Sequence, residues 1–213
     1  MKEDAPFRAA LAAGAVSLDL SIPVEALERM ARHQALLARW APRMNLVGDA
    51  RWEKTVETHF LDSLALLRLL PAETPEWMDV GTGAGFPGVV LASARPDLRV
   101  KLLEPQEKRV SFLHQLIQGL PECALELHRG RTEDLQPGSQ KALLSRAVLP
   151  PSTWITEAAA LVAPGGWIVL MTARGPDDPT CAVAENTGLV EERRDDFTLP
   201  GGAPRVNVLY RRG

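Results

Sequence analysis

The residues best suited to bind a ligand lie in the glycine-rich segment 79–88, Asp-Val-Gly-Thr-Gly-Ala-Gly-Phe-Pro-Gly. Apolar runs precede and follow this segment, which predicts a strand, a tight turn and the start of a helix. Glycine adopts positive φ readily and lets a ligand approach the backbone where a Cβ atom would exclude it. The segment therefore predicts a ligand-binding loop; the simpler alternative is a turn that only joins a strand to a helix.

Three of these glycines, Gly83, Gly85 and Gly88, also match the G-x-G-x-x-G fingerprint of dinucleotide-binding proteins. In that interpretation, free N–H groups at the helix N-terminus bind a pyrophosphate. Pro87 stands where one of these groups is needed and has no N–H to donate. A ligand without phosphate groups fits the loop better, and a nicotinamide dinucleotide remains the alternative.

Other polar residues follow apolar runs that predict strands. Glu104 ends the run 100–103, about 20 residues after the first loop glycine, where an acid can accept hydrogen bonds from ribose hydroxyls. The loop 130–135 follows a third predicted strand, and Arg146 follows a fourth. Because the carboxyl ends of parallel strands meet at one edge of a sheet, these residues are expected to line one crevice.

Strand and helix patterns alternate along the chain, which predicts an α/β fold. We expect a doubly wound, mostly parallel seven-stranded sheet whose last two strands, 190–197 and 205–211, pair antiparallel. Two helices at about 21–41 and 51–70 come before the glycine loop. We therefore predict an N-terminal arm without firm pattern at 1–20, a helical extension at 21–72 and a ligand-binding domain at 73–213.

His59 and Asp62 lie three residues apart on the second of these helices, away from its apolar stripe. One interpretation is a functional histidine facing the crevice. The simpler one is a surface histidine that the neighbouring carboxylate orients.

Composition limits the possible functions. The chain has 213 residues, 46% of them hydrophobic, and a net charge of −3, so one substantial core is expected and bulk attraction to nucleic acid is not. No apolar run approaches the roughly 18 residues of a membrane-spanning helix. Cys123 and Cys181 lie far apart, outside any metal-ligand spacing, so we expect no metal. Glu3 and Asp4 precede the alanine-rich stretch where a signal peptide carries positive charge, and we expect a cytoplasmic protein.

The order of these parts resembles the class I methyltransferase fold, a Rossmann-like fold that binds S-adenosyl-L-methionine (AdoMet). The resemblance implies that the glycine loop holds the methionine moiety, that Glu104 binds the ribose and that the 130–135 loop meets the adenine. Three alternatives stay open: a methyltransferase acting on a small molecule, an NAD(P)-type oxidoreductase, and a nucleotide-binding protein without catalysis.

A closer resemblance rests on Asn45-Leu46, the segments 59–64 and 79–88, Glu104 with Lys108-Arg109, and the motif Ser145-Arg146-Ala147. Together they are similar to the bacterial family that methylates N7 of a guanine in 16S ribosomal RNA, known as glucose-inhibited division protein B. The likeness runs from about Pro23 to the C-terminus. It implies cofactor contacts at Asp79, Gly81, Gly83, Gly85, Phe86, Glu104, Thr132, Glu133 and Arg146, and RNA contacts at His59, Arg131, Arg146, Arg174 and Arg205.

The resemblance implies an rRNA (guanine-N7)-methyltransferase that acts on 16S ribosomal RNA or the small ribosomal subunit, and we expect a monomer that contacts no membrane. Guanine N7 carries an in-plane lone pair and can attack a methyl group without first losing a proton, so we expect no general base and assign no catalytic residue. The chain departs from the family pattern at Thr58, Glu104 and Arg174, where the family often has Arg, Asp and Lys. These changes affect RNA affinity more than cofactor binding.

Overall fold

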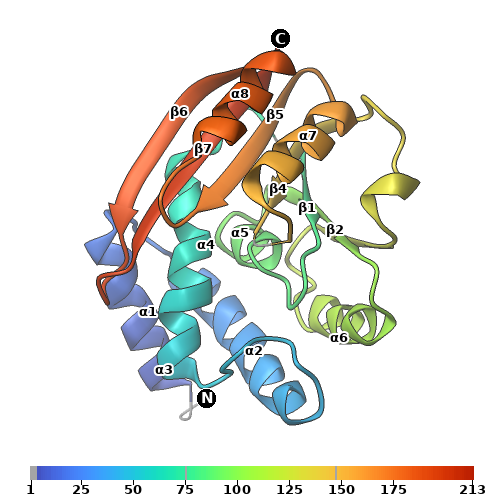
Figure 1. Ribbon diagram of the computed structural model, residues 1–213. Helices are drawn as coiled ribbons and strands as arrows, with labels where there is room; N and C mark the ends of the chain where they lie inside the picture. Colours follow the sequence, from blue (N-terminus) through green and yellow to red (C-terminus); the bar gives the residue numbers. More distant parts are fainter. Residues whose placement is uncertain (1–3, 75, 147) are drawn as a thin grey trace.

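The computed structural model describes residues 4–74, 76–146 and 148–213 (Figure 1). The first three residues of the predicted arm, and Ala147 of the predicted Ser-Arg-Ala motif, lie outside this part of the chain. Seven strands form one sheet in the order β3-β2-β1-β4-β5-β7-β6. Strands β1 to β5 pair in parallel, while β7 runs antiparallel to both β5 and β6. The predicted doubly wound, mostly parallel sheet is therefore confirmed. The strands are β1 (Glu76–Val80), β2 (Arg99–Glu104), β3 (Leu125–Arg129), β4 (Gln140–Ser145), β5 (Val162–Thr172), β6 (Leu189–Thr198) and β7 (Pro204–Arg212).

Helices cover both faces of the sheet, because alternate side chains of each strand point to opposite faces. Val100 and Leu102 belong to the core that packs under α5 and α6, whereas Leu103 belongs to the core under α7 and α8. Figure 1 shows α7 and α8 together on one side of the sheet. The bounds of these helices are α5 (Gly88–Ala94), α6 (Glu107–Gln118), α7 (Pro151–Leu161) and α8 (Asp178–Asn186).

Helix α8 had no counterpart in the sequence prediction. It buries only Thr180 and Ala184, so it carries no apolar stripe that periodicity could detect. Its start is fixed locally, because the Asp177 side chain accepts a hydrogen bond from the Thr180 backbone N–H at 3.0 Å.

The N-terminal segment is a helix packed into the core, so the expectation of an arm without firm structure is wrong for its described residues. In α1 (Ala5–Ser17) Phe7 and Leu11 are buried, and the Phe7 ring meets the Phe60 ring edge-on with centroids 5.0 Å apart. The buried side of α1 also includes Gly14 and Ala15, and such small residues give a weak sequence pattern. The division of the chain into arm, extension and ligand-binding domain stays a prediction.

Helix α2 (Val24–Trp40) leads through a short 3₁₀ turn (Ala41–Arg43) to a second helical run, 52–68. This run is irregular: α3 (Trp52–Thr55) passes into a π-helical turn (Val56–Leu61), followed by α4 (Asp62–Leu64) and a 3₁₀ turn (Ala65–Arg68). Single π-helical turns occur frequently at functional sites. Here the turn carries His59, one of the predicted site residues. Among the described residues, no helix is long and apolar enough to cross a membrane.

Polar contacts connect the helical run 52–68 to the C-terminal hairpin. The Glu57 carboxylate accepts a hydrogen bond from the Gly201 N–H at 2.9 Å, and Arg68 donates to Asp195 at 2.7 Å. Arg68 also donates to the Leu18 carbonyl just after α1. These contacts fix the N-terminal helices on the sheet that carries the glycine loop.

Candidate active site

The glycine loop between β1 and α5 is held in place by backbone hydrogen bonds. Gly81, Gly83 and Gly85 have φ values of +67°, +60° and +89°, which L side chains rarely adopt. The N–H groups of Gly81 and Thr82 donate to the carbonyl of Leu103 at 2.9 and 3.2 Å, so the loop is attached to the end of β2. The glycines are therefore required by the conformation of the turn.

Asp79 supports this loop from inside the protein. Its Oδ2 accepts hydrogen bonds from the Thr82 hydroxyl at 2.6 Å and from the Gly88 N–H at 2.8 Å. The side chain is fully buried, and burial raises the pKa of Asp79 to about 7 although both hydrogen bonds oppose this. These contacts give Asp79 a structural role, and its direct contact with a cofactor stays a prediction.

The close contact between Gly88 and Asp79 leads to a stability prediction. An added Cβ atom at Gly88 would lie 2.7 Å from Asp79 Oδ2 and 2.9 Å from Leu102 Cδ2. We expect Gly88→Ala to lower the free energy of unfolding by about 1–3 kcal/mol, as overpacked cores do. The matched control is Gly48→Ala, since a Cβ atom at Gly48 meets nothing within 4 Å. Urea denaturation of both variants measures the difference, and equal midpoints would contradict the packing argument.

Glu104 joins the end of β2 to the glycine loop. Its Oε2 accepts a hydrogen bond from the Gly83 N–H at 3.0 Å, and its Oε1 accepts one from the Gln106 N–H at 2.9 Å. The residue is only 1% exposed. Each carboxylate oxygen accepts more than one hydrogen bond, so lone pairs remain for a ligand. The predicted proximity of Glu104 and the glycine loop is therefore present in the structure.

A cleft of about 390 Å³ opens between these segments and the N-terminal helices. Its size lies in the range of small-molecule sites. Among the predicted site residues, the cleft is lined by Gly81, Gly83, Phe86, Glu104, Arg146 and His59. Sequence reasoning missed Val47, Pro105, Gln106, Arg109 and Val148, which complete the wall with Leu46, Thr82 and Ala84. Gln106 and Arg109 could have been found, because Gln106 precedes α6 at the carboxyl end of β2 and Arg109 lies in its first turn, within the Lys108-Arg109 motif of the resemblance.

Several predicted residues lie outside this lining. A Cβ atom added at Gly85 would meet Val89 and His33 rather than the cleft. The Thr132 hydroxyl donates to the Glu157 carboxylate at 3.0 Å. Contacts of Gly85, Thr132 and Glu133 with a cofactor therefore stay predictions. The same holds for RNA contacts of Arg131 and Arg174, both exposed beyond the carboxyl ends of their strands.

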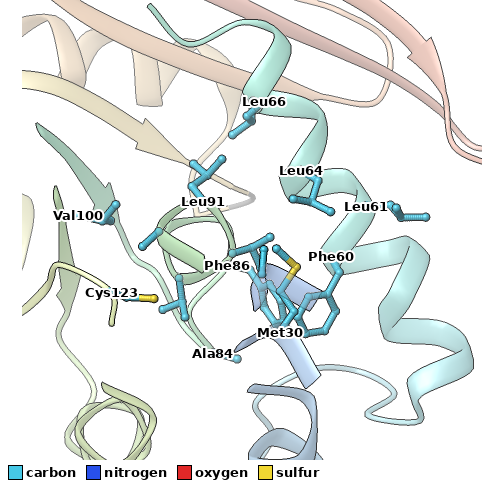
Figure 2. Close-up of a cluster of buried hydrophobic side chains, with 14 of the residues drawn as sticks. Met30, Phe60, Leu61, Leu64, Leu66, Ala84, Phe86, Leu91, Val100 and Cys123 are labelled. Carbon is cyan, nitrogen blue, oxygen red and sulfur yellow. The ribbon is translucent and has the colours of Figure 1, made fainter. Parts of the chain in front are cut away.

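The Phe86 ring connects the glycine loop to the N-terminal helices (Figure 2). It is stacked between His33 of α2 and His59 of the π-helical turn, with centroids 4.7 and 4.9 Å away and interplanar angles of 20° and 24°. The Arg146 guanidinium carbon lies 5.3 Å from the Phe86 centroid. Helices distant in sequence thus position the loop.

His33 holds the loop through a hydrogen bond as well. Its Nε2 lies 2.8 Å from the Ala84 carbonyl, which can only accept, so Nε2 carries the hydrogen. The ring is fully buried, and burial lowers the pKa of His33 to about 4 although the bond to Ala84 opposes the shift. His33 is therefore neutral at pH 7.

This shift predicts an acid-dependent contribution to stability. The folded-state pKa of His33 lies below the unfolded value of 6.5, so the unfolded chain binds the extra proton and stability falls as pH drops from 6.5 towards 4. At about 1.4 kcal/mol per pKa unit, the loss at pH 4 is about 3 kcal/mol. We expect His33→Phe to lose this part of the pH dependence. Denaturation at several pH values between 4 and 7 tests it; parallel curves for variant and wild type would refute the assignment.

A charged cluster lies at the edge of the cleft, where β4 ends. Arg146 donates through Nη1 to the Thr58 carbonyl at 2.8 Å, lies 3.4 Å from Asp62 Oδ2, and approaches His59 Nδ1 through Nη2 at 2.8 Å. Arg205 of β7 donates through Nε to Asp62 Oδ1 at 3.0 Å. Two guanidinium groups therefore share one carboxylate, and burial lowers the pKa of Arg146 while Asp62 opposes this.

This cluster corrects the interpretation of His59. The simpler interpretation of the sequence predicted a surface histidine that Asp62 orients. In the structure, Arg146 and not Asp62 makes the hydrogen bond to the His59 ring. Asp62 itself is buried and binds the two arginines. In the described part of the chain, no group of three or more His, Cys, Asp or Glu side chains could hold a metal ion.

Solved structures share this architecture. The geranyl diphosphate C-methyltransferase of Streptomyces coelicolor A3(2), in complex with Mg²⁺, geranyl diphosphate and S-adenosyl-L-homocysteine, matches 85% of this chain and 98% of its own at a TM-score of 0.59 and 15% identity. With the glycine loop after β1 and an acid at the end of β2, the chain has the class I methyltransferase fold.

Comparison with known sequences shows the family to which this chain belongs. The family model described as "GidB: rRNA small subunit methyltransferase G" matches residues 26–192, and the chain belongs to this family. A relative from Anaeromyxobacter sp. (strain Fw109-5), "Ribosomal RNA small subunit methyltransferase G", is 35% identical over 206 residues, which cover 94% of this chain and 95% of that protein. One of the same name from Desulfotalea psychrophila is 42% identical over 125 residues, 58% of this chain and 57% of that protein.

Proposed function

We propose that this protein transfers a methyl group from AdoMet to N7 of a guanine in the 16S ribosomal RNA of the small subunit. The observation that carries the proposal is the convergence of the glycine loop, Glu104, His59 and Arg146 on one cleft. Membership of the GidB family supports ribosomal RNA as the substrate.

The residues of the cleft fit AdoMet. Glu104 is an acidic hydrogen-bond acceptor suited to the two ribose hydroxyls. Gly83 lines the cleft, and an added Cβ atom there would have no protein neighbour closer than the Gly81 carbonyl at 3.9 Å, so a side chain would occupy space that the ligand needs. Phe86 and Val148 supply apolar surface. The start of α5 suits a pyrophosphate poorly, because the Gly88 N–H already donates to Asp79 and the Val89 N–H to the Gly85 carbonyl.

When bound, AdoMet supplies an electrophilic methyl group on a sulfonium. Guanine N7 needs no general base, so the work of the protein is to hold the two reactants in line, which contributes on the order of 7–11 kcal/mol in favourable cases. Glu104 and the glycine loop hold one reactant, and the cluster of His59 and Arg146 lies at the place for the other. The rigid attachment of Arg146 to Thr58 and Asp62 serves this orientation.

Recognition of the RNA must be local, because the net charge of the chain is −3. Arg131, Arg174 and Arg205 follow or lie on strands near the cleft edge of the sheet, and arginine binds phosphate groups bidentately. Since a reactive base must leave its stack to enter a cleft, an unpaired RNA loop is the favoured substrate.

Incubation with tritiated AdoMet and small ribosomal subunits from cells that lack the endogenous enzyme tests the proposal. We expect label in RNA, released as 7-methylguanosine on digestion to nucleosides. Label found only in small molecules would favour the small-molecule methyltransferase, and no label with a protein that binds AdoMet would favour a binding protein without catalysis. Label in a nucleoside other than 7-methylguanosine would reject the N7 assignment.

A further inference from the structure

The hydrogen-bonding state of His59 follows from its neighbour. Nδ1 of His59 lies 2.8 Å from Nη2 of Arg146. A guanidinium only donates hydrogen bonds, so Nδ1 must be the acceptor and carries no hydrogen. A neutral imidazole then carries its hydrogen on Nε2. The contact with Arg146 therefore selects one tautomer of His59.

The surroundings keep this ring neutral and fixed. Burial, followed by the charge of Arg146 and by His33, lowers the pKa of His59 to about 3, which excludes imidazolium at neutral pH. The ring is stacked on Phe86 at 4.9 Å, so it has contacts on its face and at Nδ1. Within the described residues, the hydrogen bond of the His59 side chain is at Nδ1, and Nε2 has no partner and is not enclosed by protein atoms. His59 lines the cleft. The protein thus presents one oriented N–H donor there.

A donor at this place distinguishes guanine from adenine. Next to N7, guanine carries O6, which accepts a hydrogen bond, whereas adenine carries an amino group, which donates. An N–H donor that cannot reverse its polarity favours the first base and is left unpaired by the second, and unpaired buried donors are costly.

We propose that the Nε2–H of His59 donates a hydrogen bond to O6 of the target guanine and that His59 is a specificity-determining residue. This inference rests on the proposed function, since it needs guanine N7 as the methyl acceptor. It goes further by naming the group that selects guanine.

Two variants separate the two nitrogens of the ring. His59→Asn keeps an acceptor where Nδ1 lies and removes the donor at the position of Nε2. His59→Gln reaches the position of Nε2 with an amide N–H and keeps the donor. A lost neutral hydrogen bond corresponds to about a 5- to 30-fold change, so we expect His59→Asn to lower kcat/KM by that factor and His59→Gln to retain most of it.

The deciding substrate pair consists of small subunits that carry either guanine or 2-aminopurine at the methylated position. 2-Aminopurine keeps N7 but has hydrogen in place of O6. Wild type and His59→Gln should methylate the guanine subunit at least several-fold faster than the 2-aminopurine subunit, and His59→Asn should lose most of this preference. AdoMet affinity, measured by calorimetry, should change little in either variant and also shows that each is folded.

Two results would overturn the inference. One is an unchanged preference for guanine in His59→Asn. The other is a loss of AdoMet affinity in His59→Asn that equals its loss of kcat/KM, since the donor would then serve the cofactor. If wild type methylates neither subunit, the proposed function itself fails, which is a separate and recognisable result.

Discussion

Replacing Arg146 by alanine is expected to lower kcat/KM for ribosomal RNA about 100-fold, the size of effect that a misplacement of the reactants by about 1 Å can cause. Arg146 lines the cleft and contacts Thr58, Asp62 and His59 through two nitrogens. Its removal deletes a positive charge from the cleft and also releases the tautomer of His59. Initial rates of methyl transfer to small subunits measure the effect.

Lysine should not restore the activity of this position. The planar guanidinium of Arg146 contacts Thr58, Asp62 and His59 at the same time. The ammonium group of lysine is a point charge and cannot reproduce this geometry. The matched control is Arg99→Ala, because Arg99 is 66% exposed at the amino end of β2, the opposite edge of the sheet from the cleft. A fall of less than tenfold in a folded Arg146→Ala variant would remove Arg146 from the account.

The second large effect is expected on stability. Asp62 is buried, with a side chain 7% exposed, and lies between Arg146 and Arg205. We expect Asp62→Asn to lower the free energy of unfolding by about 3–5 kcal/mol, because it leaves two neighbouring guanidinium groups without their shared counter-ion. Chemical denaturation measures this loss.

A double-mutant cycle identifies its cause. Arg205→Gln removes one of the two guanidinium groups, so the combined variant Asp62→Asn with Arg205→Gln should be more stable than the sum of the single losses predicts. Strict additivity of the two losses would show that Asp62 does not act through Arg205. In that case the stability loss of Asp62→Asn would have to come from its contact with Arg146.

The sequence was sufficient for the sheet and for one side of the cleft. The loop glycines follow the first strand, Glu104 ends the second and Arg146 follows the fourth, and the carboxyl ends of parallel strands lie at one edge of the sheet. Gly83 and Glu104 are accordingly joined by a hydrogen bond across 21 positions of the chain. This side of the cleft is formed by residues at strand ends, and short sequence patterns are sufficient to predict strand ends.

The other side of the cleft depends on packing between distant segments. His33 meets Ala84 across 51 positions, and Arg205 meets Asp62 across 143. In the sequence His33 is one polar residue in an amphipathic helix, and nothing marks it as a support for Phe86. The π-helical turn at Val56–Leu61 likewise shifts His59 relative to a regular helix, which periodicity cannot show. The sequence therefore predicts which side of the helical run 52–68 is buried, but not which residues its side chains contact.

A crystal structure with bound S-adenosylhomocysteine would show whether this cleft is the AdoMet site. We expect the ligand in the cleft, with its ribose hydroxyls on the Glu104 carboxylate and its sulfur between the glycine loop and the His59–Arg146 side of the wall. Ligand density at any other place, or an empty cleft in crystals saturated with a ligand that the protein binds in solution, would contradict it.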